Sequence, residues 1–464
     1  MIRSKPLLII LLFMTGNVLL AQNAVLFPHL DEVQQVLQRN PAQPFDAKVS
    51  IALGSAFVGY RNNIFDYGDF DPDLPVVPQL ESITLSHTQT EKINLNARVD
   101  LFGVSILTEV GRFSVGLSQR ADLKVAIPEE FTNYIFFGDS YLQGKQLEVS
   151  DLNAEASSFI EVALRYQTPM RDEGLSFGGS LKILGGQGHG LFSDALGKTS
   201  NLTASDTFFV EARGRVRSSG PAAFGSDTTL GIRHLLTKPN NMGLGVDLGL
   251  HYQLDDTWSF GVSLLDVGFM RWSRRVYDAR FGAKFRSVGF PKLVSGTANL
   301  EELGSSLDSL IIDEPFPDTQ APEDYGQAYT RGLKPSILGT ANAQVSEAFE
   351  VGMSYGYDVD ALRGAHSIGL NAKVNAGEYV QALAGYSFAG PKHSGLGLGL
   401  VMALGPLQVY ATADNVLDLV DQDKLNGVAV NAGANLIFPM VWFGESSRLK
   451  GKKMKRKAVK CYQF

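Results

Sequence analysis

Alternation of apolar and polar residues, sustained over stretches of about ten residues, is the feature that most constrains the fold. Between residues 244 and 254 every second side chain is apolar or aromatic, and those between are small, polar or charged. The apolar set is Leu244, Val246, Leu248, Leu250 and Tyr252. Because side chains alternate across a β-strand, the two sets fall on opposite faces. A second arm at 258–272 follows the turn at Asp255, Asp256 and Thr257, so the region predicts a β-hairpin.

The same pattern returns along the chain, and its polar side carries charges of both signs. Alternating stretches lie at 95–101, 113–125, 160–167, 176–183, 208–215, 367–375 and 428–436. A soluble β-sandwich also alternates in this way. The connections argue for a membrane barrel, because tight ones near 346–348, 375–378 and 404–406 contrast with long regions at 60–94, 126–156, 216–240 and 291–334. Short periplasmic turns and long outer loops are typical of outer-membrane proteins.

We therefore predict an all-β fold, a transmembrane antiparallel β-barrel with a short N-terminal helix and long extracellular loops. Seven strands are expected between Lys334 and Phe438. The stretch 278–290 is either a spanning strand or part of an outer loop. Since a closed chain with both ends in the periplasm needs an even number, we expect about 14 strands, with 12 and 16 as alternatives.

The ends of the chain differ from the barrel in composition. Residues 1–21 resemble a signal peptide, with Arg3 and Lys5 before an apolar core, which predicts export to the bacterial outer membrane. We expect an N-terminal helical segment at 22–44, the barrel at 45–444 and a basic periplasmic tail at 445–464. The single cysteine, Cys461, excludes an internal disulfide. The formal net charge of −7 argues against nucleic acid as a partner.

The N-terminal segment has the clearest helical spacing in the chain. Leu26, Leu30, Val33 and Leu37 recur at helical intervals, and the pattern ends before Asn40 and Pro41. Two interpretations remain: a plug inside the barrel, or an ordinary amphipathic lead-in to the first strand, which we favour.

Charged and polar side chains on the inner faces of the strands are the candidate lumen-lining residues for a pore or ligand. They are Asp100, Arg120, Asp122, Glu161, Arg165, Lys182, Glu211, Arg213, Asp247, His251 and Lys373. No serine or acid can be matched to His251 from the sequence, so we expect no catalytic site and no cofactor. Charge pairs that rigidify the lumen are the default interpretation.

Four other stretches are candidates for binding. Alternate carboxylates at Asp66, Asp69, Asp71 and Asp73 form a weak calcium candidate, and a solvated acidic loop is favoured. The acidic segment 293–330, with a short helix possible at 300–312, is an outer lid, a partner-binding insertion or an acidic loop. The glycine-rich run 185–190 predicts a flexible strand end or loop rather than a phosphate site. The basic tail either contacts lipid headgroups or an acidic partner, or is solvated.

Several short motifs, taken in order, resemble an uncharacterised outer-membrane β-barrel family of Bacteroidota with a domain of unknown function. They are Arg39–Ala42, Ser176–Lys182, the hairpin 244–272, Tyr329–Pro335 and Ala413–Val416. That family is similar to FadL-like transporters of hydrophobic compounds and to the PorV-like and SprF-like barrels of type IX secretion. The resemblance implies a barrel in contact with outer-membrane lipid, and it carries over no functional residue.

Two functions follow from this interpretation, and neither is enzymatic. The first is passive, FadL-like transport of a small apolar compound through a lumen plugged by the N-terminal helix. The second is a scaffold for secretion or surface-protein anchoring, which would hold a periplasmic or surface protein through the loops or the basic tail. An apolar pocket beneath the outer loops would favour the transporter.

Overall fold

β-Strands make up nearly all of the part of the chain that the computed structural model describes. That part comprises residues 26–45, 47–62, 91–130, 133, 152–169, 174–201, 208–220, 241–287, 311–315, 326–359, 365–377, 379–388, 394–417 and 427–438. Two short 3₁₀ helices come first, η1 (Phe27–His29) and η2 (Gln34–Gln38). Among the described residues, no helix is long and apolar enough to cross a bilayer.

Eighteen strands follow in one sheet. They are β1 (Val49–Asn62), β2 (Glu91–Thr108), β3 (Gly111–Ile127), β4 (Asn153–Gln167), β5 (Leu175–Asn201), β6 (Phe208–Ser219), β7 (Asn241–Gln253), β8 (Trp258–Trp272), β9 (Tyr277–Ser287), β10 (Ile311–Pro315), β11 (Tyr329–Gly332), β12 (Ser336–Ser346), β13 (Phe349–Asp358), β14 (Ala365–Ala376), β15 (Val380–Phe388), β16 (Ser394–Leu404), β17 (Leu407–Asp414) and β18 (Gly427–Phe438).

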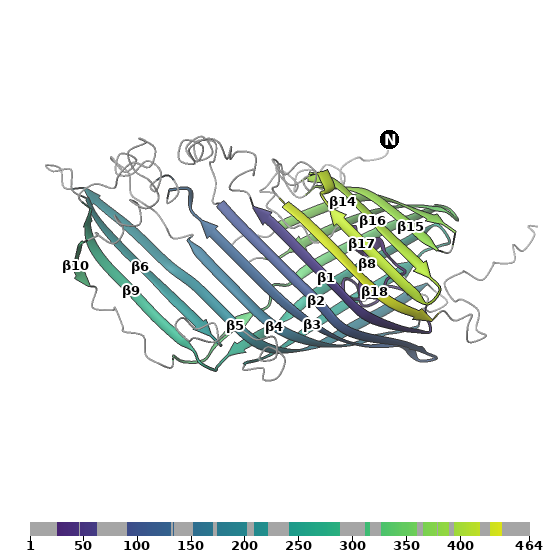
Figure 1. The fold of residues 1–464 in the computed structure, drawn as a ribbon, viewed down its shortest axis with the longest axis horizontal. Helices are drawn as coiled ribbons and strands as arrows, with labels where there is room; N and C mark the ends of the chain where they lie inside the picture. Colours follow the sequence, from purple (N-terminus) through teal and green to yellow (C-terminus); the bar gives the residue numbers. More distant parts are fainter. Residues whose placement is uncertain are drawn as a thin grey trace, which may run out of the picture.

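In the described part of the chain, 14 of these strands close into one antiparallel barrel, which confirms the predicted fold class (Figure 1). The wall runs from β1 through β5 to β7 and β8, continues with β12, and returns through β18. β18 pairs with β1 from Val49 opposite Phe438 to Arg61 opposite Gly427, which closes the ring. The seven strands expected after Lys334 are β12 to β18.

Four further strands prolong one side of the wall instead of adding to the ring. β5 pairs with β7 up to Gly186 and then with β6 from His189 onwards. β6 pairs with β9, β9 with β10, and β11 with the end of β8. Figure 1 shows β6, β9 and β10 together at one end of the molecule. The stretch 208–215, which was expected to span the membrane, therefore lies in this extension. Of the undecided stretch 278–290, residues 278–287 also lie there, and the rest is outside the described part of the chain.

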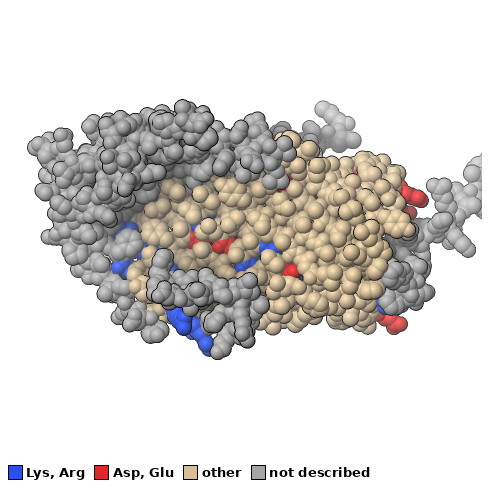
Figure 2. Space-filling view, viewed as in Figure 1, with Lys and Arg blue, Asp and Glu red and all other residues tan. Residues whose placement is uncertain are grey.

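The two faces of the wall have opposite chemistry. In the β7–β8 hairpin, Leu244 and Leu248 are 47% and 55% exposed on the outside, whereas Asp247 and His251 are buried inside. On the face shown in Figure 2, Lys, Arg, Asp and Glu are almost absent from the barrel wall, apart from a small group near its middle and a few at the edges. Apolar side chains outside and polar ones inside are the construction of a barrel that crosses a membrane.

Residues 26–45, which we call the lumen segment, lie inside the barrel. Gln34 accepts a hydrogen bond from Ser50 of β1, and Asn40 donates one to the Leu250 carbonyl of β7. Asp31 forms an ion pair with Lys373 of β14, and Gln408 of β17 donates to the Glu32 carbonyl. These contacts reach strands on several sides of the ring, so the segment lies in the lumen and is surrounded by the wall.

The single helix predicted over 26–37 is wrong in type, because the segment forms two short 3₁₀ helices with a turn between them. The physical reason is its surroundings. Gln34, Gln35 and His29 are buried together with Leu26, Leu30 and Val33. Both polar and apolar side chains of the segment are therefore buried against the wall, and contacts with the strands replace most of the solvent-facing side that an amphipathic helix requires.

Wall glycines make room for the lumen segment. A Cβ atom on Gly178 of β5 would overlap the Pro41 backbone, and one on Gly249 of β7 would overlap the Asn40 side chain. On the other side of the lumen, Gly385 and Gly397 leave space for Leu26. Glycines at positions far apart in the sequence therefore allow the wall to pack closely against this segment.

Several predictions concern residues outside the described part of the chain. They are the signal peptide at 1–21, the acidic loop with Asp66, Asp69, Asp71 and Asp73, and the basic tail at 445–464. Most of the acidic segment 293–330 is also outside, although Ile311 and Ile312 belong to β10 and so cannot end a helix.

Candidate functional site

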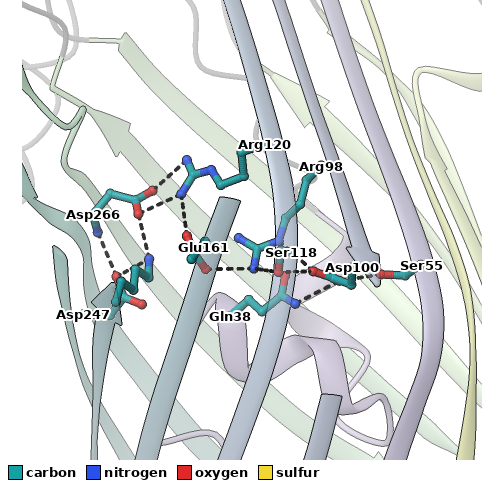
Figure 3. Close-up of polar contacts among 10 residues, drawn as sticks. Gln38, Ser55, Arg98, Asp100, Ser118, Arg120, Glu161, Asp247 and Asp266 are labelled. Carbon is teal, nitrogen blue, oxygen red and sulfur yellow. Dashed lines mark hydrogen bonds and ion pairs between the residues drawn. The ribbon is translucent and has the colours of Figure 1, made fainter. Parts of the chain in front are cut away.

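A chain of alternating charges crosses the inner wall from β1 to β8. Asp100 of β2 accepts hydrogen bonds from Arg98 and from Ser118 of β3 at 2.9 and 2.8 Å. Arg98 also reaches Glu161 of β4 at 3.0 Å. The second carboxylate oxygen of Glu161 accepts a hydrogen bond from Arg120 of β3 at 3.1 Å. Four strands, β1 to β4, contribute to this half of the network, since Ser55 of β1 also donates to Asp100 (Figure 3).

Asp266 of β8 continues the same network to β5 and β7. Arg120 donates to both of its carboxylate oxygens, at 3.0 and 3.1 Å. Lys182 of β5 lies 2.6 Å from Asp266 and 2.6 Å from Asp247 of β7. We call the set Arg98, Asp100, Arg120, Glu161, Lys182, Asp247 and Asp266 the luminal ion-pair network. Because each buried charge has an oppositely charged neighbour, the network rigidifies this wall.

A β-bulge brings Asp266 into the lumen. Its φ of 56° lies in the left-handed region, which is uncommon for a residue other than glycine. Before it, Val262 is exposed outside and Ser263 is buried inside; after it, Val267 is exposed outside and Met270 is buried inside. The phase of the alternation therefore changes at Asp266, and its backbone N–H donates to Asp247 at 2.8 Å.

The predicted lumen residues are only partly brought together. Asp100, Arg120, Glu161, Lys182 and Asp247 join the network, and Asp122 lines the cavity above it. Arg165 faces a small pocket beside Gln34 and Gln38. His251 is buried on the inner face of β7, and Lys373 forms ion pairs with Asp31 and Glu350 on β13. Glu211 and Arg213 lie on β6 in the extension, where Arg213 is exposed.

A cavity of about 230 Å³ lies in the lumen above the lumen segment. Gln38 and Arg39 of the segment form part of its lining, and Gln38 donates to Asp100 at 2.9 Å. Phe57, Phe159 and Trp272 give it aromatic surface beside the charged network. The volume is just below the range of about 300–1,000 Å³ that holds drug-sized ligands, so the cavity suits a smaller compound.

The cavity lining also contains a cluster around His189, which the sequence did not single out. His189 is hydrogen-bonded to Tyr329 of β11 at 2.7 Å and lies 3.3 Å from Glu155 of β4. Its ring stacks on Trp272 with the centroids 4.8 Å apart. The glycine-rich run 185–190, expected to be a strand end or loop, is instead the middle of β5. At Gly186 a Cβ atom would overlap the Trp272 ring, so at this position the strand needs glycine to pack against Trp272.

The lumen segment holds a buried histidine next to charged groups. His29 donates from Nδ1 to the Asn342 side-chain oxygen of β12 at 2.7 Å, while Nε2 has no partner among the described residues. Burial, and to a smaller extent the nearby Lys373, lowers the pKa of His29 from 6.5 to about 4. The segment is therefore docked with His29 neutral at pH 7.

No group of three or more metal-ligating side chains occurs among the described residues. The weak calcium candidate lies outside them, as do the basic tail and most of the acidic segment. The scaffold function that was inferred from the tail and the loops stays a prediction.

The model of a family of unknown function, DUF5723, matches residues 41–414. Among solved structures, the toluene transporter TbuX of Ralstonia pickettii is 9% identical, with a TM-score of 0.43 over 88% of this chain and 94% of that chain. The P. putida toluene transporter TodX is 12% identical, with a TM-score of 0.44 over 88% and 94%.

A Pseudomonas aeruginosa FadL homologue is 11% identical, with a TM-score of 0.44 over 89% of this chain and 96% of that chain. At this level of similarity neither the fold nor the function of those proteins is carried over. No curated protein matches the chain. Nothing in these comparisons bears on Bacteroidota or on PorV-like and SprF-like barrels, so that part of the resemblance stays a prediction.

Proposed function

The chain belongs to the DUF5723 family, which is of unknown function, and we propose from its geometry that it is a bacterial outer-membrane barrel for passive uptake of a small, largely apolar compound. The observation that carries the proposal is the cavity of about 230 Å³ in the lumen, lined by Phe57, Phe159 and Trp272 beside polar groups. Ligand sites commonly combine apolar walls with a few placed polar groups. No residue is proposed to do chemistry on the compound.

The lumen segment is the plug in this proposal. It contacts strands around the ring, and Gln38 and Arg39 lie against the cavity. A compound bound in the cavity therefore meets the segment before it reaches the end of the barrel with the tight turns. We propose that this end faces the periplasm, since short turns lie on that side in outer-membrane barrels.

A pair of tryptophan substitutions on neighbouring residues of β4 tests the role of the cavity. Ser157 lines the cavity, whereas Ala156 is exposed on the outer face. Ser157→Trp fills the cavity with an indole ring, and Ala156→Trp adds the same ring to the lipid side. We expect cells that carry the wild type or Ala156→Trp to accumulate a labelled monoaromatic compound faster than cells without the protein, and Ser157→Trp to remove that gain.

Surface abundance and the shift of the folded barrel on unheated gels show that both variants assemble. Equal uptake by Ser157→Trp and Ala156→Trp would mean that the cavity is not on the route. Uptake that does not depend on the protein at all would contradict the proposed function.

A further inference from the structure

The outer end of β8 and the bend that follows it carry three exposed arginines, Arg271, Arg274 and Arg275, which we call the rim arginines. Their side chains have no hydrogen bond or ion pair within the part of the chain that the structure describes. Met242 of β7 and Thr330 of β11 lie opposite Arg271 on the two neighbouring strands, and neither is acidic. The described strands beside the rim arginines therefore leave their positive charge unneutralised.

Arg271 lies on the lipid side of the wall. Along the end of β8, Val267 and Phe269 are exposed on the outer face, whereas Met270 and Trp272 are buried on the inner face. Arg271 follows Phe269 in the same phase of the alternation and is exposed like it. The apolar outer face of the strand is thus continued directly by a positive charge.

The height of this charge matches the edge of the apolar layer of a membrane. Trp258 and Phe260 stack on each other at the opposite end of β8, with their ring centroids 6.3 Å apart. From Trp258 to Phe269 the strand rises about 36 Å, which at a tilt of about 45° is about 26 Å along the membrane normal. The apolar band of an outer-membrane barrel is about 25 Å tall. Arg271 therefore stands where the lipid headgroups begin.

The bend after β8 is held in one conformation. The side-chain oxygen of Asn241 accepts hydrogen bonds from the backbone N–H groups of Ser273 and Arg274, at 2.7 and 3.0 Å. Ser219 donates to the Arg274 carbonyl at 2.8 Å. Arg275 has a φ of 47°, in the left-handed region that residues other than glycine seldom adopt. The rim arginines are therefore presented from a fixed backbone rather than from a simple continuation of the strand.

We propose that the rim arginines bind the phosphate groups of a phosphorylated glycolipid in the outer leaflet, whose acyl chains lie against Val267 and Phe269. Arginine suits this partner because its planar guanidinium can donate two hydrogen bonds to one phosphate. Cations next to an apolar surface also attract anionic lipids. The continuity of the positive charge with the lipid-facing wall favours a lipid over a free anion. The site rests on the outer-membrane location in the proposed function and is independent of the transported compound.

Native mass spectrometry of the full-length protein in detergent tests this site by counting bound molecules of added diphosphoryl lipid A. We compare the wild type with Arg271→Gln/Arg274→Gln. The expected loss of affinity is roughly 30-fold, since each cation near an anionic lipid surface contributes roughly a factor of five. Phosphatidylcholine, which has no net charge, should bind weakly and equally to both proteins. Excess inorganic phosphate should not displace the lipid, because it makes no contact with the apolar face.

A matched control removes two exposed arginines from another place. Arg213 and Arg280 lie on the face of the extension that carries the ion pair of Arg215 with Asp278. Arg213→Gln/Arg280→Gln changes the net charge by the same amount and is expected to bind lipid A as the wild type does.

The shift of the folded barrel on unheated gels shows that each variant assembles. If Arg271→Gln/Arg274→Gln does not, the two single variants carry the comparison, each with a loss of roughly five-fold. Equal affinity of the wild type and the rim variants, an equal loss in the control, or displacement by inorganic phosphate overturns the lipid site. Uptake that Ser157→Trp blocks and Ala156→Trp does not would then still support the proposed function, which stands or falls on that separate measurement.

Discussion

At the scale of single residues, Asp266 connects backbone geometry to the charge of the lumen. Its left-handed φ turns the side chain inward, where it pairs with Arg120 and Lys182. Strict alternation along β8 would have put Asp266 on the lipid side, which is why the sequence predicted Asp247 and Lys182 but missed the residue that joins them. Arg98 lies two residues before Asp100 on the same face of β2, so the period of two is enough to predict that this pair can meet. Its contact with Glu161 of β4 cannot be predicted in this way, because it depends on how the strands pair.

Asp266→Asn separates the two roles of this residue. Asparagine tolerates the left-handed conformation but cannot neutralise Arg120 and Lys182. We expect the free energy of unfolding to fall by about 3 kcal/mol, as for a broken buried ion pair, and further in Asp266→Ala, which also loses the local preference for this backbone. Denaturant unfolding in detergent measures both. Asp255→Asn in the exposed β7–β8 turn serves as a control, and an equal loss there would show that the network contributes no specific stability.

His29 makes docking of the lumen segment sensitive to pH. The pKa is lowered from 6.5 to about 4 in the docked state, so docking is strongest above pH 6.5 and weakens as the pH falls toward 4. The shift corresponds to about 3 kcal/mol when complete. We expect Phe27 and Leu30 to become more reactive in hydroxyl-radical footprinting at pH 4.5 than at pH 7. His29→Asn keeps a donor for Asn342 and leaves Asp31 and Lys373 in place, and it should remove this dependence. Identical protection at both pH values would contradict the assignment of the switch to His29.

At the scale of elements, the positions of most strands could be predicted from the sequence. Which strands form the closed ring and which form the extension could not. The period of two located β7, β8 and the seven strands from β12 onwards, since a wall with lipid outside and water-filled space inside imposes that pattern on every strand. The first half of β5 pairs with β7 and the second half pairs with β6. This division depends on pairing between distant parts of the chain, which a local sequence pattern cannot predict. The lumen segment was misjudged for the same reason, because its neighbours are distant strands.

Substitution of a glycine that faces the lumen segment tests whether the segment packs against the wall. In Gly178→Val the new side chain would overlap the Pro41 backbone, which cannot rotate away. We expect the segment to be displaced, so that trypsin cleaves after Arg39 in the folded barrel. Gly190→Val is on the same strand, where a Cβ meets nothing within 4 Å, and should leave the wild-type resistance intact. Resistance in Gly178→Val would mean that the segment is not seated against β5.

At the scale of the whole molecule, three layers lie along the barrel axis. The lumen segment occupies the end with the tight turns, the luminal ion-pair network and the cavity lie above it, and the extension of β6, β9 and β10 stands beyond them (Figure 1). The barrel itself could be predicted from the sequence, but the cavity could not. Its lining combines the lumen segment with residues of β1 to β5, β8, β11, β12, β13 and β18, and only closure of the ring brings these together.

The central claim is that the lumen segment closes a barrel whose interior is otherwise polar and passable. Planar-bilayer conductance tests it most directly, by comparing the wild type with a variant that lacks residues 26–40 and keeps every strand of the ring. We predict little or no steady conductance for the wild type and a stable, open channel for the deletion, with both proteins showing the gel shift of a folded barrel. Equal conductance of the two folded proteins would contradict the account.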